Sequence, residues 1–93
     1  MTSPDSAMHY VYLLRSLADV RQRYVGLTGD LRARLNAHNT GSSFHTAKFR
    51  PWKLVAYIAF ADKTRAAGFE RYLKSGSGHA FAERHLWEPP ECC

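Results

Sequence analysis

The chain has 93 residues, 45% hydrophobic and 23% charged, which is enough for one soluble domain but too little for two domains with separate cores. Its longest apolar run, residues 54–61, is far shorter than the roughly 20 residues of a membrane span, and the polar segment 1–7 is unlike a signal peptide. Thirteen Lys and Arg against eight Asp and Glu give a net charge of +5, which favours a polyanionic partner such as nucleic acid.

The two cysteines indicate the compartment. Cys92 and Cys93 are neighbours near the end of the sequence, an arrangement unsuited to a disulfide framework. We therefore expect a cytoplasmic protein. Its one domain is expected to span residues 8–87, with flexible tails at 1–7 and 88–93.

The first elements are predicted to be two paired strands. Residues 8–17 are rich in aromatic and β-branched side chains, and the short run 23–27 follows a polar turn, so an antiparallel hairpin is expected. The first strand is apolar on both faces, as a strand covered on each side would be. Tyr10, Tyr12 and Leu14 lie on one face, and Val11 and Leu13 lie on the other.

A helix, a basic loop and a third strand come next. Asp30 is a suitable N-cap for a helix over residues 31–39, and Gly41 is suited to end it. Residues 40–51 are rich in turn formers and basic side chains and are predicted to form a loop. Residues 52–60 are apolar throughout, so we expect a third strand at the centre of the sheet.

Two further helices complete the chain. Asp62 is suited to cap a helix over residues 63–74, residues 75–78 (SGSG) interrupt it, and residues 79–86 favour a short third helix. The predicted fold is therefore α/β, a small three-stranded antiparallel sheet flanked by helices in the order β-β-α-β-α-α.

Several polar residues border the predicted core. Arg34 and His38 share one side of the first helix with its leucines, and a basic pair at the core margin requires an anion or a satisfied network. Glu70 borders the buried face of the second helix, four residues before Lys74. Taken singly, these residues are also explained by structural ion pairs, and the strand tyrosines by core packing.

Taken together and in order, the same residues resemble the GIY-YIG nuclease family. Tyr10-Val11-Tyr12 stands where that family has Gly-Ile-Tyr, and Tyr24-Val25-Gly26 where it has Tyr-Ile-Gly. Arg34, His38 and Glu70 follow at matching places, and the resemblance runs from about Tyr10 to Leu86. Tyr10 in place of the first glycine and Leu27 in place of a lysine depart from the pattern, and a later asparagine of the repair-nuclease branch has no evident counterpart.

The resemblance implies a metal-dependent endonuclease that hydrolyses DNA phosphodiester bonds. Glu70 would be the single carboxylate that holds one Mg²⁺ or Mn²⁺ ion, and Arg34 would bind the phosphate. Tyr12 would be the general base, with its pKa lowered by Arg34 and the metal, and Tyr24 would orient the water or the phosphate. His38 would relay the proton or hold Tyr12, and the sequence leaves both roles open.

Basic side chains outside this set are predicted to grip the nucleic acid backbone. They are His45, Lys48 and Arg50 in the loop, with Lys74 and Ser77 near the end of the second helix. The loop also contains Phe44 and Phe49, which would either stack on unpaired bases or cover the core, and stacking would favour single-stranded or flapped DNA.

Two alternatives remain at this level. One is a non-catalytic nucleic-acid-binding module on the same fold. The other is an interaction protein in which the basic residues form structural ion pairs. The sequence is also compatible with RNA as the substrate and with a protein partner that targets the domain.

Overall fold

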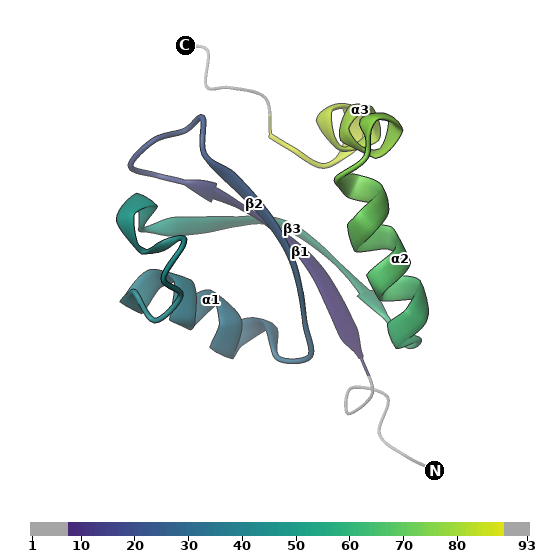
Figure 1. The fold of residues 1–93 in the computed structure, drawn as a ribbon, viewed down its shortest axis with the longest axis horizontal. Helices are drawn as coiled ribbons and strands as arrows, with labels where there is room; N and C mark the ends of the chain where they lie inside the picture. The colour runs from purple at the N-terminus through teal and green to yellow at the C-terminus, as the bar shows by residue number, and fades with distance from the viewer. Residues whose placement is uncertain (1–7, 89–93) are drawn as a thin grey trace.

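The computed structural model describes residues 8–88, and these contain the predicted elements in the predicted order (Figure 1). The elements are β1 (His9–Ser16), β2 (Arg23–Thr28), α1 (Leu31–Thr40), a 3-10 helix (Ala47–Phe49), β3 (Trp52–Phe60), α2 (Lys63–Leu73) and α3 (Gly76–His85). The predicted fold class is therefore confirmed. The predicted tails at 1–7 and 88–93, and with them both cysteines, lie outside the described residues except for Glu88.

The three strands form an antiparallel sheet in the order β2-β1-β3. The expectation that residues 52–60 lie at the centre is therefore wrong, because the central strand is β1. Four consecutive residues of β1, from Val11 to Leu14, are almost completely buried, whereas β3 exposes Tyr57 and Ala59 on one side. An apolar run can thus form an edge strand, because much of the surface of any folded protein is made of apolar atoms.

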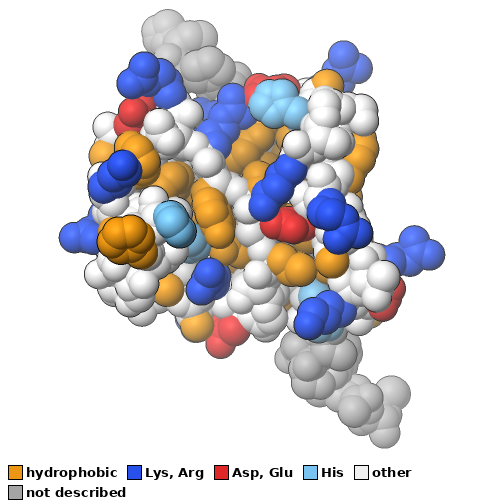
Figure 2. Space-filling model, viewed as in Figure 1, with side chains coloured by type: hydrophobic (Ala, Val, Ile, Leu, Met, Phe, Trp, Pro, Cys, Tyr) orange, Lys and Arg blue, Asp and Glu red, His pale blue; other side chains and the backbone are white. Residues whose placement is uncertain are grey.

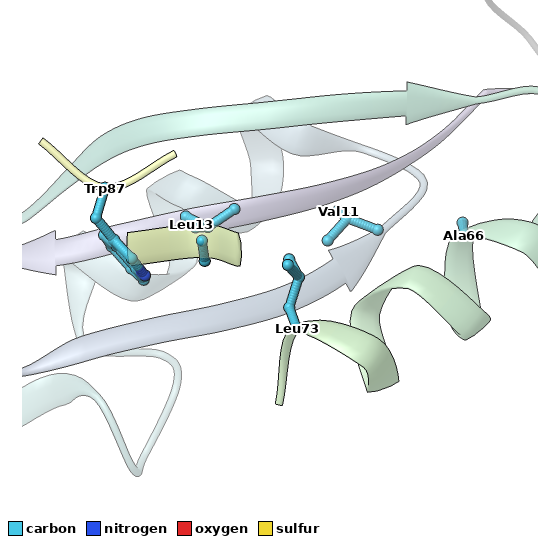
Figure 3. Close-up of a cluster of buried hydrophobic side chains, with 6 residues drawn as sticks. Val11, Leu13, Ala66, Leu73 and Trp87 are labelled. Atoms are coloured by element: carbon cyan, nitrogen blue, oxygen red, sulfur yellow. The ribbon is translucent and has the colours of Figure 1, made fainter. Parts of the chain in front are cut away.

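Helices cover both faces of β1, as the apolar side chains on both of its faces predicted. On one face, Val11 and Leu13 pack with side chains from α2, from α3 and from the segment after it (Figure 3). On the other face, Tyr12 and Leu14 pack with Trp52 and with leucines of α1. In Figure 1, α1 lies on one side of the strands and α2 and α3 on the other.

The helix ends follow their capping residues. The side chain of Asp30 accepts a hydrogen bond from the Ala33 amide, and Gly41 ends α1 with a φ of 90°, in the left-handed region that favours glycine. The third helix begins at Gly76 rather than at 79, because Ser75 caps it by accepting from the Gly78 amide. The glycines at 76–78 therefore belong to the helix and do not interrupt it.

The C-terminal end of the described chain is held against the sheet. Glu88 was expected in the tail, but its carboxylate accepts hydrogen bonds from Lys53 Nζ at 3.0 and 3.1 Å. The Arg23 guanidinium lies 4.7 Å from the ring centre of Trp87, a cation–π contact. Within residues 8–88, no helix has the length and apolarity that crossing a membrane requires.

Candidate active site

Tyr12 reaches the site because its partner on β2 is a glycine. Tyr12 pairs with Gly26 in the sheet register, and its side chain is only 1% exposed. A Cβ atom at Gly26 would lie 2.5 Å from the Tyr12 hydroxyl oxygen and 2.8 Å from Cε2 of Tyr24. The missing side chain therefore lets the Tyr12 ring lie across β2, next to Tyr24.

A chain of hydrogen bonds leads from Tyr12 into the protein. The Tyr12 hydroxyl lies 3.0 Å from Nε2 of the fully buried His38, and Nδ1 of His38 lies 2.7 Å from Oγ1 of Thr46. The Thr46 hydroxyl donates to the Ser43 carbonyl at 3.3 Å. We assign the His38 tautomer with its hydrogen on Nδ1, because the Thr46 hydroxyl donates to Ser43. In this tautomer Thr46 accepts from Nδ1–H, and Nε2 accepts from the Tyr12 hydroxyl.

Tyr24 and Arg34 complete this cluster toward the surface. The Tyr24 ring centre lies 6.0 Å from that of Tyr12 and 4.8 Å from that of His38. Arg34 is exposed on α1, one turn before His38. The structure thus brings together four of the five predicted catalytic residues at the face that α1 covers.

Burial controls the protonation of this cluster. Burial raises the pKa of Tyr12 to about 12, although the nearby Arg34 guanidinium opposes the rise. The expected lowering of this pKa is therefore absent in the resting protein, where Tyr12 is a neutral phenol. Burial, and secondarily the charge of Arg34, lowers the pKa of His38, so His38 is a neutral base at pH 7. The neighbouring Tyr12 hydroxyl raises the pKa of Arg34, which stays charged.

Glu70 comes from α2, which packs on the opposite face of the sheet. Its side chain is 20% exposed, and its Oε2 accepts from Lys74 Nζ at 2.7 Å. Among residues 8–88, no hydrogen bond or ion pair links Glu70 to the Tyr12 cluster. Its neighbour Lys74, however, lines an open pocket of about 570 Å³ together with Tyr24 and Val25 of β2. Because β2 is an edge strand, groups from both faces of the sheet meet at this pocket.

The donor set near Glu70 is small. No group of three or more His, Cys, Asp or Glu residues that could surround an ion occurs in the described part of the chain. Over the same residues, the Glu70 side chain makes one hydrogen bond, through Oε2, and is 20% exposed. One accessible carboxylate fits a magnesium ion that keeps most of its water, and does not fit a protein-enclosed metal site.

The predicted nucleic-acid-binding residues form two groups. His45, Lys48 and Arg50 line a pocket of about 470 Å³ with Phe44, in the loop after α1. Lys74 follows the last residue of α2, and Ser77 is exposed in the first turn of α3. The groups are carried by elements on opposite sides of the sheet (Figure 1). Figure 2, drawn in the same view, shows Lys and Arg side chains on both halves of the molecule.

Sequence reasoning missed the role of Thr46 and gave none to Gly26. A buried histidine requires a partner for its second ring nitrogen, and that requirement is the signal for a residue such as Thr46. The sequence alone does not select Thr46, because Ser42 and Ser43 lie in the same loop. For Gly26, the signal is a glycine inside a strand, which often marks a close approach of another group.

Comparison with known proteins finds a matching family model and several relatives. The family model of the GIY-YIG catalytic domain matches residues 8–82. The structure-specific endonuclease subunit SLX1 of Candida dubliniensis is 35% identical over 98 residues, covering 91% of this chain and 33% of that protein. The SLX1 homologue of Drosophila mojavensis is 44% identical over 69 residues. The chain thus spans about a third or less of the length of these relatives.

Shorter relatives match along most of their length. A UPF0213 protein of Lacticaseibacillus paracasei is 36% identical over 84 residues, covering 86% of this chain and 92% of that protein. The solution structure of a UPF0213 protein from Bacillus halodurans superposes with a TM-score of 0.51 at 31% identity, and the match covers 83% of each chain.

Proposed function

The chain belongs to the GIY-YIG family, and from this premise we propose that it is an endonuclease that hydrolyses DNA phosphodiester bonds with one divalent metal ion. The observation that carries the proposal is the hydrogen bond between Tyr12 and the buried, neutral His38, beside Tyr24 and Arg34. The name of the SLX1 relatives, structure-specific endonuclease subunit, supports the reaction class.

In the proposed reaction, Tyr12 and His38 act as one base. The oxygen of Tyr12 takes a proton from the attacking water while its own proton passes to Nε2 of His38. The water oxygen forms a bond to phosphorus, and the bond from phosphorus to the 3′ oxygen breaks. The released 3′ oxygen takes up a proton from solvent, and His38 returns its proton to solvent, so one water is added across the bond and the products are a 3′ hydroxyl and a 5′ phosphate. A phenol with a pKa of about 12 is a poor resting base, and its hydrogen bond to His38 removes the need to ionise it first.

Arg34 is proposed to hold the scissile phosphate. Its guanidinium is permanently charged, exposed, and next to both tyrosines, so it can bind phosphate oxygens and offset charge in the transition state. Tyr24 borders the pocket at the edge of β2 and is suited to orient the water or the phosphate.

Glu70 is proposed as the protein ligand of Mg²⁺ or Mn²⁺. When bound, the ion would act as a Lewis acid on the phosphate and stabilise the leaving oxygen. Lys74 neutralises the Glu70 carboxylate in the absence of the ion, and its exposed ammonium can turn to a DNA phosphate instead.

We also propose which molecules the domain binds: DNA with an unpaired segment, and a protein partner. The net charge of +5 supports DNA, and the exposed loop residues support a single-stranded or flapped form. The word subunit in the names of the SLX1 relatives supports a protein partner that targets the nuclease. A cytoplasmic location stays a prediction from the sequence.

The test is cleavage of end-labelled single-stranded, duplex and flapped DNA in Mg²⁺, Mn²⁺ or EDTA. Wild type should cut only with metal, and Glu70→Ala and Tyr12→Phe should not cut. Glu88→Ala is a control, because Glu88 also forms a single exposed ion pair with a lysine, Lys53, and does not line the pocket of Tyr24 and Lys74. The Glu70–Lys74 pair is partly exposed, so Glu70→Ala should lose only about 0.5 kcal/mol of stability.

Two results would refute the proposal that the domain is a nuclease. DNA binding that falls with salt, with no cleavage of any substrate, would identify a non-catalytic binding module. The absence of both cleavage and DNA binding would favour an interaction protein.

A further inference from the structure

The loop between α1 and β3 is fixed at several points close to the site. Thr46 contacts His38, the Phe49 carbonyl accepts from the hydroxyl of buried Ser16, and the Asn39 side chain bonds both backbone groups of Trp52. The Trp52 indole N–H also donates to the Thr46 carbonyl at 2.9 Å. The second half of the loop is therefore held to α1 and to the sheet.

The two phenylalanines of this loop have different environments. Phe49 is half-buried, and its ring packs against Trp52 with centres 6.4 Å apart, so it belongs to the core. Phe44 is 86% exposed, more than any other large hydrophobic residue in the described chain. Burying a phenylalanine side chain stabilises a fold, and Phe44 forgoes nearly all of this stabilisation. The core therefore does not explain Phe44.

The surroundings of Phe44 are cationic. It lines its pocket of about 470 Å³ with His45, Ala47, Lys48 and Arg50, and no acidic residue is among them. The five ion pairs formed by the described residues all lie outside this loop. An aromatic face beside unneutralised cations matches one base and its neighbouring phosphates, whereas a hydrophobic protein partner would leave Lys48 and Arg50 buried without counter-ions.

Phe44 also lies near the reacting groups. It precedes Thr46 by two residues, a separation of at most about 7 Å along the backbone. Thr46 is joined to the Tyr12 hydroxyl through the His38 ring by contacts of 2.7 and 3.0 Å. A base on Phe44 would therefore be within a few nucleotides of the bond that is cut.

We propose that Phe44 is the stacking platform for an unpaired base beside the scissile phosphate, with Lys48 and Arg50 holding the flanking phosphates. The inference rests on the proposed function, because it places that base relative to the same site. A fully paired duplex keeps its bases stacked on one another, so Phe44 selects DNA with an unpaired segment at the site of cleavage.

The test measures binding without cleavage. Glu70→Gln protein is titrated with flapped DNA carrying 2-aminopurine at successive unpaired positions, and with a blunt duplex of equal length. Stacking on Phe44 should quench the fluorescence at one position. Adding Phe44→Ala should abolish the quenching and weaken flap binding roughly 5- to 150-fold, with little change for the duplex. Phe44→Tyr should restore both.

Matched variants separate stacking from charge. Tyr57→Ala removes another exposed aromatic, on β3, and should leave binding unchanged. Lys48→Ala should weaken flap and duplex alike and reduce the salt dependence. The inference is overturned if Phe44→Ala keeps the quenching, if it lowers flap and duplex binding equally, or if Glu70→Gln binds no DNA. Cleavage by wild type decides the proposed function separately, whichever result binding gives.

Discussion

Replacing Thr46 with valine tests whether catalysis depends on one tautomer of His38. The hydroxyl of Thr46 accepts from Nδ1–H of His38 and donates to the Ser43 carbonyl. Thr46→Val keeps the branched shape but leaves the buried Nδ1–H without an acceptor, which should cost about 1–3 kcal/mol. For a domain of this size, each kcal/mol lowers Tm by roughly 4–8 °C.

The same change should also slow cleavage. Without Thr46, His38 gains access to the tautomer in which Nε2 carries the hydrogen and can no longer accept from Tyr12. Complete loss of a general base costs about 10²- to 10⁴-fold, so partial loss through the tautomer should lower the single-turnover rate about 10- to 100-fold. The rate is measured well below the Tm of both proteins, and ¹⁵N shifts of the His38 ring report the tautomer.

Thr46→Ser is the matched control, because it keeps the hydroxyl and removes only the methyl group. It should recover most of the cleavage rate even though its Tm stays below that of wild type. A Thr46→Val protein that cuts at the wild-type rate with a lowered Tm would show that Thr46 supports only the fold, and the tautomer argument would fail.

Four further predictions concern stability and close packing. The pKa of Tyr12 is about 12 in the folded protein and 10 in a free tyrosine. The free energy of unfolding, measured by urea titration, should therefore fall by about 3 kcal/mol as the pH rises from 10 to 12. Tyr12→Phe should remove this fall. Because the pKa of His38 is lowered, stability should also fall as pH drops below its ordinary value of 6.5, and His38→Gln should flatten this limb. Gly26→Ala should abolish cleavage by displacing the Tyr12 ring, whereas Gly29→Ala, where a Cβ meets nothing, should not. A Cβ at Gly78 would collide with the Tyr72 carbonyl, so Gly78→Ala should lower Tm strongly. A Cβ at Gly76 meets nothing, so Gly76→Ala should lower Tm little. Equal Tm values for the two variants would contradict this packing.

Local signals in the sequence predicted most of the fold. The period-two alternation of residues 8–17 assigned Val11 and Tyr12 to opposite faces, and the structure confirms this. The position of β3 was predicted wrongly because apolarity reports burial and not the order of strands. Which strand lies at the centre depends on pairing between distant segments, here 9–16 with 52–60.

The residues of the candidate site could be predicted from the sequence, but the pKa of Tyr12 and the hydrogen-bond partner of His38 could not. The resemblance to the GIY-YIG motif predicted Tyr12 and Arg34 as site residues, and the structure brings the two side chains together. The pKa of Tyr12 depends on how much water the fold removes, and burial outweighs the effect of Arg34. The partner of His38 depends on the loop path, which contacts such as Asn39 with Trp52 set between distant residues.

The position of β2 at the edge of the sheet restricts how copies of this domain can assemble. In the described chain, the outer edge of β2 pairs with no other strand, and its backbone N–H and C=O groups are open to a strand from another molecule. Such a strand would cover the pocket between Tyr24 and Lys74. Any complex that extends the sheet while leaving this pocket open must therefore add its strand beside β3.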